Sequence, residues 1–468
     1  MLFKKKKEAK QPTPFAGREA FASGKTVAFE LETMYCDLIA LDHTLKIQPG
    51  SKTACRIEKT GKSSDAISYA AAASATGLRT AVFSHSEKSA QLIDGLNDAV
   101  AKHHPVVFHF TSPNNAFLQH VIDSGALIFY ANDVQALADL SIIGRVAAER
   151  TLLPSVVLSD ARLQNKIQLY LQPEKELLQH FAGAARESIE APTPAQEMVF
   201  GKKRRRVPRL IDLDKPLGVL NGINGTFATH SSTADYVFSA SHDESIVQQC
   251  MAEFAKLTGR DYRTSRTHAT SDAQHFIVAE GTVYHELCPI VDYLALKENI
   301  KCGVLHLNAF TTQALKDAAE KLATVRNVTV IENLHNTSTK QKPLTRLLQQ
   351  ALIENHGKTG NFITAIDSGS SGENSVAIYS AIVRNMASVS EPKTRYFLGA
   401  HFSQPELRLP KLEMLQQEVS RNYPDVEKIA LSLDTAEKRM VVGKQATLYG
   451  ETLVEDKEIA LLCAAFTS

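Results

Sequence analysis

The chain of 468 residues contains no tryptophan, and aromatic residues make up only 7% of it. Flat aromatic platforms that stack on sugars or nucleobases are therefore not favoured. Neither sign of charge prevails, because 52 lysines and arginines stand against 51 aspartates and glutamates. A chain so balanced produces no long-range field that would attract nucleic acid, so we predict that it has no nucleic-acid partner.

Cysteine is sparse and scattered, and no two cysteines stand in a C-x-x-C arrangement. A disulfide framework would be denser, and an iron–sulfur or zinc site needs clustered thiolates. We therefore expect reduced, mostly buried thiols, no metal ligands in this chain, and a cytoplasmic location. The six are Cys36, Cys55, Cys250, Cys288, Cys302 and Cys463.

Long apolar runs are absent as well. The longest, such as residues 70–73 and 459–466, are too short to span a bilayer, so we expect no integral membrane segment. The N-terminus begins Met1-Leu2-Phe3 and continues with Lys4–Lys7 and no apolar stretch, which is not typical of a secretory signal. We interpret residues 1–25 as a flexible basic N-terminus. Contact of its lysines with a membrane surface or a partner is the less favoured alternative.

The usual catalytic and nucleotide-binding motifs are missing too. Gly61-Lys62-Ser63 and Gly357-Lys358-Thr359 end as a phosphate loop does, but Arg56 and Leu352 occupy the position of its first glycine. Gly369–Gly372 lacks the spacing of a serine hydrolase elbow, and neither G-x-G-x-x-G nor H-E-x-x-H occurs. The sequence therefore carries no self-sufficient catalytic motif.

What the chain does contain is alternation of strands and helices. Its length predicts two to four domains. In the first part, residues 26–190, short β-rich runs alternate with apolar residues at helical spacing, which predicts parallel βαβ units in an open sheet. The predicted strands are 79–84, 106–110, 125–130 and 154–158, and the predicted helices are 66–75, 90–103 and 134–150.

A second α/β unit is predicted over residues 245–390, with the period of a doubly wound sheet. A small C-terminal extension follows over 391–468, with β-like pieces at 396–399, 428–433 and 439–442, and is either an appended unit or a dimerisation arm. The predicted strands of the second unit are 274–280, 302–307, 327–332 and 361–366, and its helices are 245–257, 283–297, 312–322, 344–355 and 376–385.

Residues 191–244 are predicted to be a linker, because prolines, a basic run and a turn rich in glycine and asparagine break the pattern. The basic run, 202–206, resembles a nuclear-localisation or phosphate-binding patch. In a chain of nearly neutral charge we favour a solvated linker or an intersubunit contact instead.

Single charged residues near strand ends are weaker signals. Glu280, Glu286 and Glu332 lie where open α/β sheets bind ligands, but a surface carboxylate on a loop is the commoner explanation. His109 and His306, each on a predicted strand, are more often packed and hydrogen-bonded residues than metal ligands.

Three stretches together resemble the pyruvate:ferredoxin (flavodoxin) oxidoreductases. They keep the family's order and spacing from about residue 61 to residue 385. The resemblance implies a thiamine-diphosphate-fold, pyrimidine-binding module followed by a transketolase-C-terminal-like α/β module. The stretches are IEKTGKSSDAISYAAAASATGLRTAVFSHSEK at 57–88, PVVFHFT at 105–111, and FAKLTGRDY at 254–262 with SDAQHFIVA at 271–279.

The resemblance also shows departures at the implied site. In the family a glutamate opens the first helix and activates thiamine, a proton-relay role that requires a carboxyl group. Ser63 stands at that position here, and Glu58 and Asp65 are too far along the chain to share its face. Pro113 aligns with the family's substrate-binding arginine, and the early T-P-S-S loop has no counterpart between residues 15 and 42.

We therefore assign no catalytic residue and no metal ligand. The candidate cofactor-binding residues are the helix start and the turn that replaces the family's T-A-S-Q-G, namely Ser63, Ser84, His85, Ser86 and Glu87. The resemblance implies that the chain alone binds no cofactor. Thiamine diphosphate with Mg²⁺ is expected only when a partner subunit is present.

The implied function is that of a subunit in a 2-oxoacid oxidoreductase-like electron-transfer system, with a degenerate thiamine half-site and a structural or docking role. We expect a homo-oligomer, or a complex with an iron–sulfur, flavin or thiamine-binding subunit. The alternative is a non-catalytic scaffold of assimilatory sulfite reductase, because the N-terminal modules of fungal sulfite reductase flavoprotein subunits are similar. A transketolase-like enzyme acting alone is the weakest hypothesis.

Overall fold

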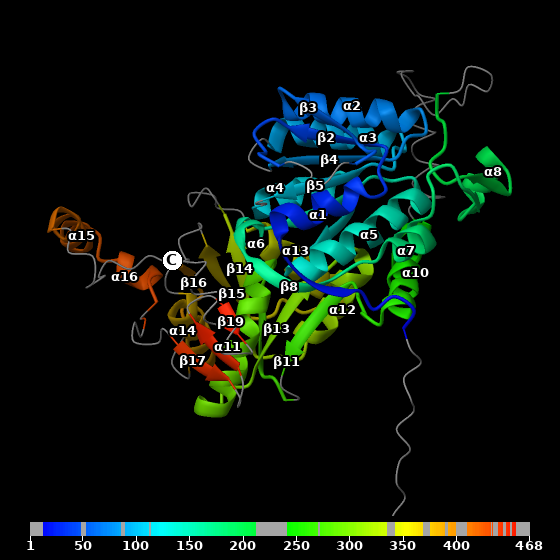
Figure 1. The fold of residues 1–468 in the computed structure, drawn as a ribbon. Helices are drawn as coiled ribbons and strands as arrows, with labels where there is room; N and C mark the ends of the chain where they lie inside the picture. The colour runs from blue at the N-terminus through cyan, green and yellow to red at the C-terminus, as the bar shows by residue number, and fades with distance from the viewer. Residues whose placement is uncertain are drawn as a thin grey trace, which may run out of the picture.

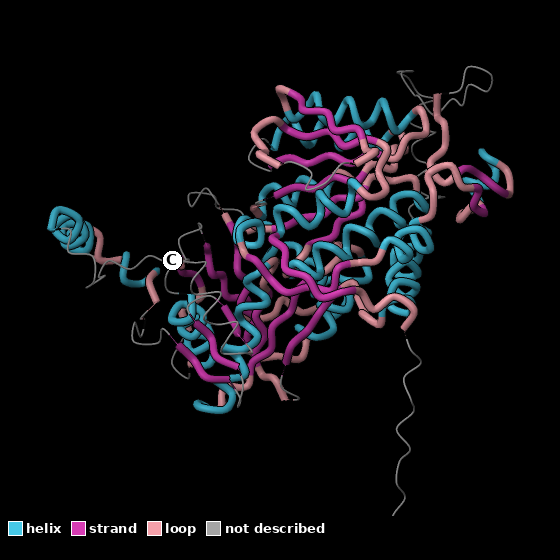
Figure 2. Tube along the Cα trace, in the orientation of Figure 1, coloured by secondary structure: helices cyan, strands magenta, loops and turns pink. Residues whose placement is uncertain are grey.

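The computed structural model has two open α/β sheets (Figures 1 and 2). It describes residues 13–47, 53–85, 89–111, 114–211, 241–269, 272–334, 342–367, 375–388, 392–398, 410–431, 433, 439–442, 446–449 and 452–454.

The first sheet has six parallel strands in the order β3-β2-β4-β5-β7-β6. The strands β2, β5 and β7 are buried at every position, as expected for a parallel sheet that helices cover on both faces. The four predicted strands of this part are confirmed. The strands are β2 (Leu38–Asp42), β3 (Arg56–Thr60), β4 (Thr80–His85), β5 (Val107–Thr111), β6 (Leu127–Tyr130) and β7 (Ser155–Ser159).

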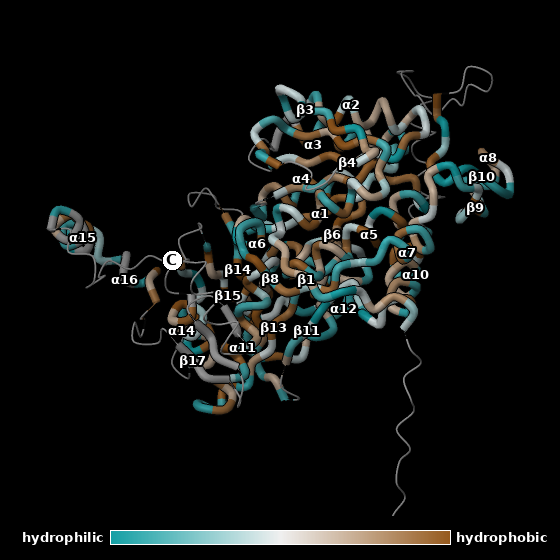
Figure 3. Tube along the Cα trace, in the orientation of Figure 1, coloured by the Kyte–Doolittle hydropathy of each residue, from teal (hydrophilic) through white to brown (hydrophobic). Residues whose placement is uncertain are grey.

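Helices cover both faces of this sheet, as Figure 1 shows. On one face α2 (Ser63–Ala75), α3 (Ser89–Ala101) and α4 (Asn115–Asp123) enclose an apolar core. On the other, α1 (Gly24–Thr33) and α5 (Val134–Thr151) enclose a second one. In Figure 3 the hydrophobic colour gathers along the strands and the inner faces of these helices.

The central helix of the first domain is α5. Nearly all of its residues are buried, and the Asp133 side chain caps it by accepting a hydrogen bond from the backbone N–H of Ala136. A later helix, α10 (Ser241–Thr258), packs on α5 and contributes Val247, Met251 and Phe254 to the same core. The helix that the sequence places at the start of the second unit thus completes the core of the first.

Buried charges tie the layers of this domain together. The fully buried carboxylate of Glu32 in α1 accepts a hydrogen bond from Arg145 Nη2 of α5 at 2.7 Å. His109 Nε2 of β5 lies 2.9 Å from the other carboxylate oxygen, and its ring stacks on Phe83. His109 is thus a packed, hydrogen-bonded residue, as predicted.

The second sheet follows the order β11-β13-β12-β14-β15-β16, and only the edge strand β11 runs antiparallel. The predicted alternation is confirmed, but β11 was not anticipated. The strands are β11 (Ser265–Ala269), β12 (His275–Val278), β13 (Cys302–Leu307), β14 (Asn327–Asn333), β15 (Phe362–Asp367) and β16 (Arg395–Phe397). The helices are α11 (Thr282–Glu298), α12 (Thr312–Leu322), α13 (Pro343–His356) and α14 (Ser375–Ala387).

The end of the predicted flexible N-terminus is ordered, so that interpretation is wrong for its last residues. Strand β1 (Arg18–Ser23) pairs antiparallel with β8 (Ile167–Gln172), and α1 begins directly after it. The short helix α6 (Ala161–Asn165) precedes β8 and joins it to the first sheet.

The basic run is not simply solvated. It includes β10 (Lys203–Arg205), which pairs with β9 (Ser188–Glu190), and α8 (Pro194–Phe200) connects the two strands. Arg204 is buried and donates hydrogen bonds to the side chain of Gln196 and to the backbone oxygen of Glu149. Because Arg206 is buried as well, the interpretation of the whole run as a solvated linker is wrong.

Parts of the C-terminal extension are described. The predicted strand at 428–433 is wrong, because α16 (Val426–Ile429) is helical there. Helix α15 (Pro410–Asn422) precedes it, and the strands β17 (Arg439–Val442), β18 (Ala446–Tyr449) and β19 (Thr452–Val454) form a small antiparallel sheet. Strands β17 and β19 lie beside α11 (Figure 1).

The five described cysteines are free thiols, and four of them are buried. Burial raises the pKa of the Cys55 thiol and of the Cys250 thiol to about 12. The expectation of reduced, mostly buried thiols is confirmed for these five, and Cys463 lies outside the described residues.

The buried carboxylate of Glu32 predicts acid sensitivity. Burial by itself would raise its pKa, but Arg145 and His109 outweigh burial and lower the pKa to about 2. A carboxyl group whose pKa is lower in the folded state stabilises the fold above the unfolded pKa, and this stability is lost as the pH falls through the folded pKa. We expect a loss of about 3 kcal/mol in unfolding free energy between pH 5 and pH 2 from this residue.

Urea unfolding at a series of pH values measures this loss. The substitution Glu32→Gln lowers stability at pH 7 and flattens the acid slope, whereas Glu30→Gln on the same helix leaves the slope unchanged. Equal slopes in the wild type and in Glu32→Gln would contradict the assignment.

Candidate functional site

Ser63, which the resemblance predicts at the family's glutamate position, lies in a buried polar cluster at the carboxyl edge of the first sheet. Ser63 opens α2, and its hydroxyl donates a short hydrogen bond to Oδ2 of Asp42 at the end of β2. The Ser84 hydroxyl, near the end of β4, lies 3.1 Å from the Ser63 hydroxyl and 3.5 Å from Asp42 Oδ2. All three side chains are fully buried, and we call them the serine–aspartate cluster.

The strand order explains why these residues meet. Strands β3, β2 and β4 are neighbours, and the carboxyl ends of parallel strands lie at one edge of a sheet. The structure thus brings together the predicted residues Ser63 and Ser84. It adds Asp42, which the sequence analysis missed although it is an acidic residue that ends the apolar run LIALD.

The Asp42 carboxylate is engaged by its own chain on both oxygens. Oδ1 accepts hydrogen bonds from the backbone N–H of Thr44 at 3.0 Å and from the Thr44 hydroxyl at 2.8 Å. His43 Nδ1 lies 3.4 Å from the same oxygen. A buried carboxylate needs hydrogen-bond donors to both of its oxygens, and residues of this chain supply them here.

The other predicted residues are only partly placed. His85 ends β4, and its Nδ1 lies 2.7 Å from the hydroxyl of Thr111 at the end of β5. Ser86, Glu87 and Pro113 lie outside the described residues.

Glu286 and Glu332 are buried and the side chain of Glu280 is 5% exposed, so the interpretation of these three glutamates as surface carboxylates is wrong. Glu286 of α11 lies 3.0 Å from Arg162 Nη1 and 2.6 Å from Lys166 Nζ, and both cations belong to the first domain. The hydroxyl of Tyr379 lies 2.9 Å from Arg162 Nη1. Burial raises the pKa of Tyr379 far above its ordinary value, and the negative charge of Glu286 raises it further.

Glu332 and His306 also take part in contacts between the two domains. Glu332, near the end of β14, accepts hydrogen bonds from Asn115 Nδ2 at 2.6 Å and from the backbone N–H of Thr345 at 2.6 Å. Glu280 lies 2.7 Å from His306 Nδ1, and the other ring nitrogen of His306 lies 2.9 Å from the backbone oxygen of Tyr130.

The backbone takes part in the same contact. Asp160, just after β7, accepts a hydrogen bond from the N–H of Thr282 at 2.7 Å. Gly281, which directly precedes Thr282, has a φ of +65°. A Cβ at this position would come within 2.6 Å of Asp160 Oδ2, so a larger residue would not fit there. Tyr130 donates from its N–H to the oxygen of Asn308 at 3.0 Å.

The two sheets therefore meet with their carboxyl edges facing each other. The ends of β5, β6 and β7 contact the ends of β12, β13 and β14. We call this contact the inter-sheet junction. Open α/β sheets bind ligands at this edge, but here its polar residues bind one another.

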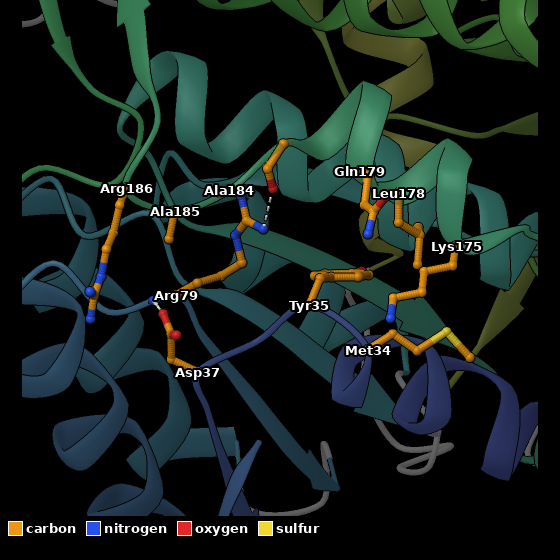
Figure 4. A pocket seen from close by; sticks show the side chains of 11 residues that line it. Met34, Tyr35, Asp37, Arg79, Lys175, Leu178, Gln179, Ala184, Ala185 and Arg186 are labelled. Atoms are coloured by element: carbon orange, nitrogen blue, oxygen red, sulfur yellow. Dashed lines mark hydrogen bonds between the residues drawn. The ribbon is translucent and has the colours of Figure 1, made fainter. Parts of the chain in front are cut away.

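A separate cavity of about 450 Å³ opens beside Tyr35 and Arg79 in the first domain (Figure 4). Arg79 is almost fully buried and forms an ion pair with Glu149 at 2.6 Å. It also donates to the backbone oxygen of Gly183 at 2.9 Å, and its N–H donates to Asp37. Because its central cation is engaged in this way, we assign no chemistry to this cavity.

Metal ligation finds no support in the part of the chain that the structure describes. No three residues of the types His, Cys, Asp and Glu gather there as a metal site requires. Among the same residues, no helix has both the length and the apolar character needed to cross a membrane.

No family model matches the sequence. The pyruvate synthase subunit PorA of Pyrococcus abyssi is 26% identical over 274 residues, which cover 55% of this chain and 64% of that subunit. The pyruvate dehydrogenase (NADP(+)) of Cryptosporidium parvum is 21% identical over 374 residues, which cover 74% of this chain and 18% of that protein. The resemblance to the pyruvate:ferredoxin oxidoreductases is confirmed.

A solved structure supports the fold. The 2-oxoglutarate:ferredoxin oxidoreductase from Magnetococcus marinus superposes with a TM-score of 0.54 at 15% identity, over 75% of this chain and 62% of that one. The predicted fold class, a thiamine-diphosphate-fold, pyrimidine-type sheet followed by a second α/β domain, is confirmed. The chain spans less than two thirds of the length of each of these three relatives.

The serine–aspartate cluster predicts a local stability effect. The substitution Ser63→Ala removes a donor from the buried Asp42 carboxylate, so we expect a loss of about 1–3 kcal/mol in unfolding free energy by urea titration. The neighbouring Ser64→Ala changes a hydroxyl outside the cluster, and we expect it to cost less than about 0.5 kcal/mol. Equal losses would show that the cluster adds no stability.

The inter-sheet junction predicts a domain-coupling effect. Glu286→Gln removes the carboxylate between Arg162 and Lys166, so we expect a loss of about 2–3 kcal/mol, discounted for the partial exposure of both cations. In the Glu286→Gln variant we also expect faster amide hydrogen exchange over residues 160–166 and 282–287, which lie on the two sides of the junction. The matched Glu298→Gln, which breaks the more exposed pair with Arg384, costs less than about 1 kcal/mol and leaves these amides protected.

Proposed function

We propose that the chain is a subunit of a 2-oxoacid:ferredoxin oxidoreductase-like assembly, and that it contributes a degenerate thiamine half-site with a structural or docking role. The likeness to a subunit of pyruvate synthase supports membership in such an assembly. The observation that carries the degenerate half-site is the contact between Ser63 and Asp42.

The residues at the implied site do not fit the aminopyrimidine of thiamine diphosphate. Ser63 occupies the first position of α2, where the family resemblance implies a glutamate, and a neutral hydroxyl cannot serve as the proton relay. Asp42 is the carboxylate next to it. It is fully buried, and both of its oxygens accept hydrogen bonds from this chain, so it offers no oxygen to a cofactor.

The inter-sheet junction supports a structural role. Residues at the carboxyl ends of three strands in each sheet, including Glu332 and Asp160, form contacts between the domains instead of facing a ligand. Such contacts fix the two domains relative to each other and present a rigid surface to a partner.

An exposed apolar face supports a docking role. Phe21 of β1 pairs across the strands with Leu169 of β8, and Ile167 lies beside them at the strand end. These three side chains are 63%, 48% and 53% exposed, which is unusual for neighbouring large apolar residues. The partner in this proposal is a second copy, or a subunit that carries iron–sulfur, flavin or thiamine groups.

Calorimetry with thiamine diphosphate and Mg²⁺ tests the degenerate half-site. We expect no saturable heat from the isolated chain, because no carboxylate is available to the pyrimidine. In an assembly with a thiamine-binding partner, we expect Ser63→Ala to leave the bound thiamine content unchanged, as the control Ser64→Ala does.

Saturable binding to the isolated chain that Asp42→Asn abolishes would overturn the degenerate half-site. Thiamine content that falls with Ser63→Ala but not with Ser64→Ala would do the same. The proposal that the chain belongs to an oxidoreductase assembly would survive both results.

The sulfite reductase alternative and the cytoplasmic location stay predictions. No contact between the described residues favours the former over the assembly proposed above.

A further inference from the structure

Strands β1 and β8, which lie side by side, carry apolar residues on both of their faces (Figure 3). On the inward face Tyr170 belongs to the core of the first domain, and Ala20 and Ala22 pack against that core. On the outward face Phe21 and Leu169 stand directly opposite each other, and both are exposed. An antiparallel pair with one face in water normally has polar residues on that face, so this pattern is the one expected for strands that are buried on both faces.

The register of the two strands defines the outward face, which we call the ribbon face. Successive residues of a strand point to opposite faces, so every second residue belongs to it. Its β8 row is apolar throughout, whereas in its β1 row Phe21 lies between two polar residues. The six residues, in opposite pairs, are Glu19 and Leu171, Phe21 and Leu169, and Ser23 and Ile167.

The outer edge of β8 is closed at Leu171. The backbone N–H of Leu171 donates to Gln135 Oε1 at 2.6 Å, and the backbone oxygen of Leu171 accepts from Gln135 Nε2 at 3.2 Å. A side chain of α5 thus takes the place that the strand of another molecule would take along this edge. The apolar residues of β8 are therefore accessible through the ribbon face and not by extension of the sheet.

The size of the apolar patch indicates the kind of contact that it supports. The exposed parts of Phe21, Ile167 and Leu169 amount to roughly 300 Å². A stable interface buries about 800 Å² on each partner and places its apolar residues at the centre, within a polar rim. The patch has the size of such a centre, so we expect a reversible association and not an obligate one.

We propose that the ribbon face binds the ribbon face of a second copy of this chain, with the strands of the two copies antiparallel about a twofold axis. This inference rests on the docking role proposed above and commits it to one partner. The axis crosses the strands at Phe21 and Leu169, so each of these side chains meets its own counterpart.

The order of residues along the ribbon face favours the antiparallel arrangement. It sets Glu19 of one copy opposite Ser23 of the other, whose hydroxyl can donate to the carboxylate. With parallel strands, the β1 row of one copy would lie on the β8 row of the other, and Glu19 would be buried against Leu171 without a donor. The antiparallel face is thus self-complementary, which is the property of an interface between identical copies.

Sedimentation velocity of the full chain at a series of protein concentrations tests the dimer. We expect a monomer–dimer equilibrium with a dissociation constant in the micromolar range. Leu169→Lys places a charge at the centre of the contact and increases the dissociation constant at least tenfold. The matched Leu296→Lys changes a leucine of α11 that is 77% exposed outside the ribbon face, and it leaves the dissociation constant unchanged.

A charge experiment tests the antiparallel arrangement. Ser23→Asp places a carboxylate opposite Glu19 of the second copy, and the repulsion increases the dissociation constant at least tenfold. Since aspartate is a favourable residue directly before a helix, this substitution keeps α1 intact. Adding Glu19→Lys to Ser23→Asp turns the repulsion into an ion pair and restores the dimer. Thermal unfolding confirms that each variant is folded.

Three results would overturn the proposal. The first is a wild-type chain that stays monomeric at every concentration, which would leave the ribbon face to a different subunit. The second is an equal dissociation constant for Leu169→Lys and Leu296→Lys. The third is a Ser23→Asp variant that Glu19→Lys does not restore, which would exclude the antiparallel arrangement. None of these results bears on the degenerate half-site, because its tests measure thiamine binding.

Discussion

The contact of Glu286 with Arg162 and Lys166 is the interaction on which the arrangement of the two domains depends. A carboxylate that is 4% exposed holds two cations from the other domain, and neither sheet could bury these charges alone. Because the contact lies where the sheets meet edge to edge, it fixes both the distance between the domains and their orientation. The hydrogen bonds of Asp160 and Glu332 then follow from that geometry.

The same principle governs the first domain, where buried charge joins layers. Glu32 connects α1 to β5 and α5, and Asp42 connects the end of β2 to the start of α2. In each case the oxygens are occupied by groups of the same chain. Buried carboxylates whose oxygens are satisfied in this way hold the layers of the domain together.

Much of the fold could be predicted from the sequence, because apolar periodicity is a local property. The strands β13 and β17 and the helix α12 were predicted with their observed bounds. The β1–β8 pair was missed, since it joins segments about 150 residues apart and its outward face is apolar where a solvated strand would be polar. The burial of Glu286 and Glu332 could not be predicted either, because Arg162 and Asn115, which contact them, come from the other domain.

The same limit applied to the candidate site. The sequence identified Ser63 and Ser84, but their partner Asp42 lies on a different strand, and only the strand order brings the three together. A fold-level resemblance gives the position of a residue along the chain. It does not give the hydrogen bonds that decide whether a carboxylate faces a ligand or its own backbone.

The packing of α10 on α5 has a consequence for biosynthesis. The residues that α10 adds to the core of the first domain, including Phe254, are synthesised about 100 residues after β7. Until then the face of α5 that α10 covers is exposed to solvent and to chaperones. The first domain therefore cannot complete its core until the segment that leads into the second domain has been synthesised.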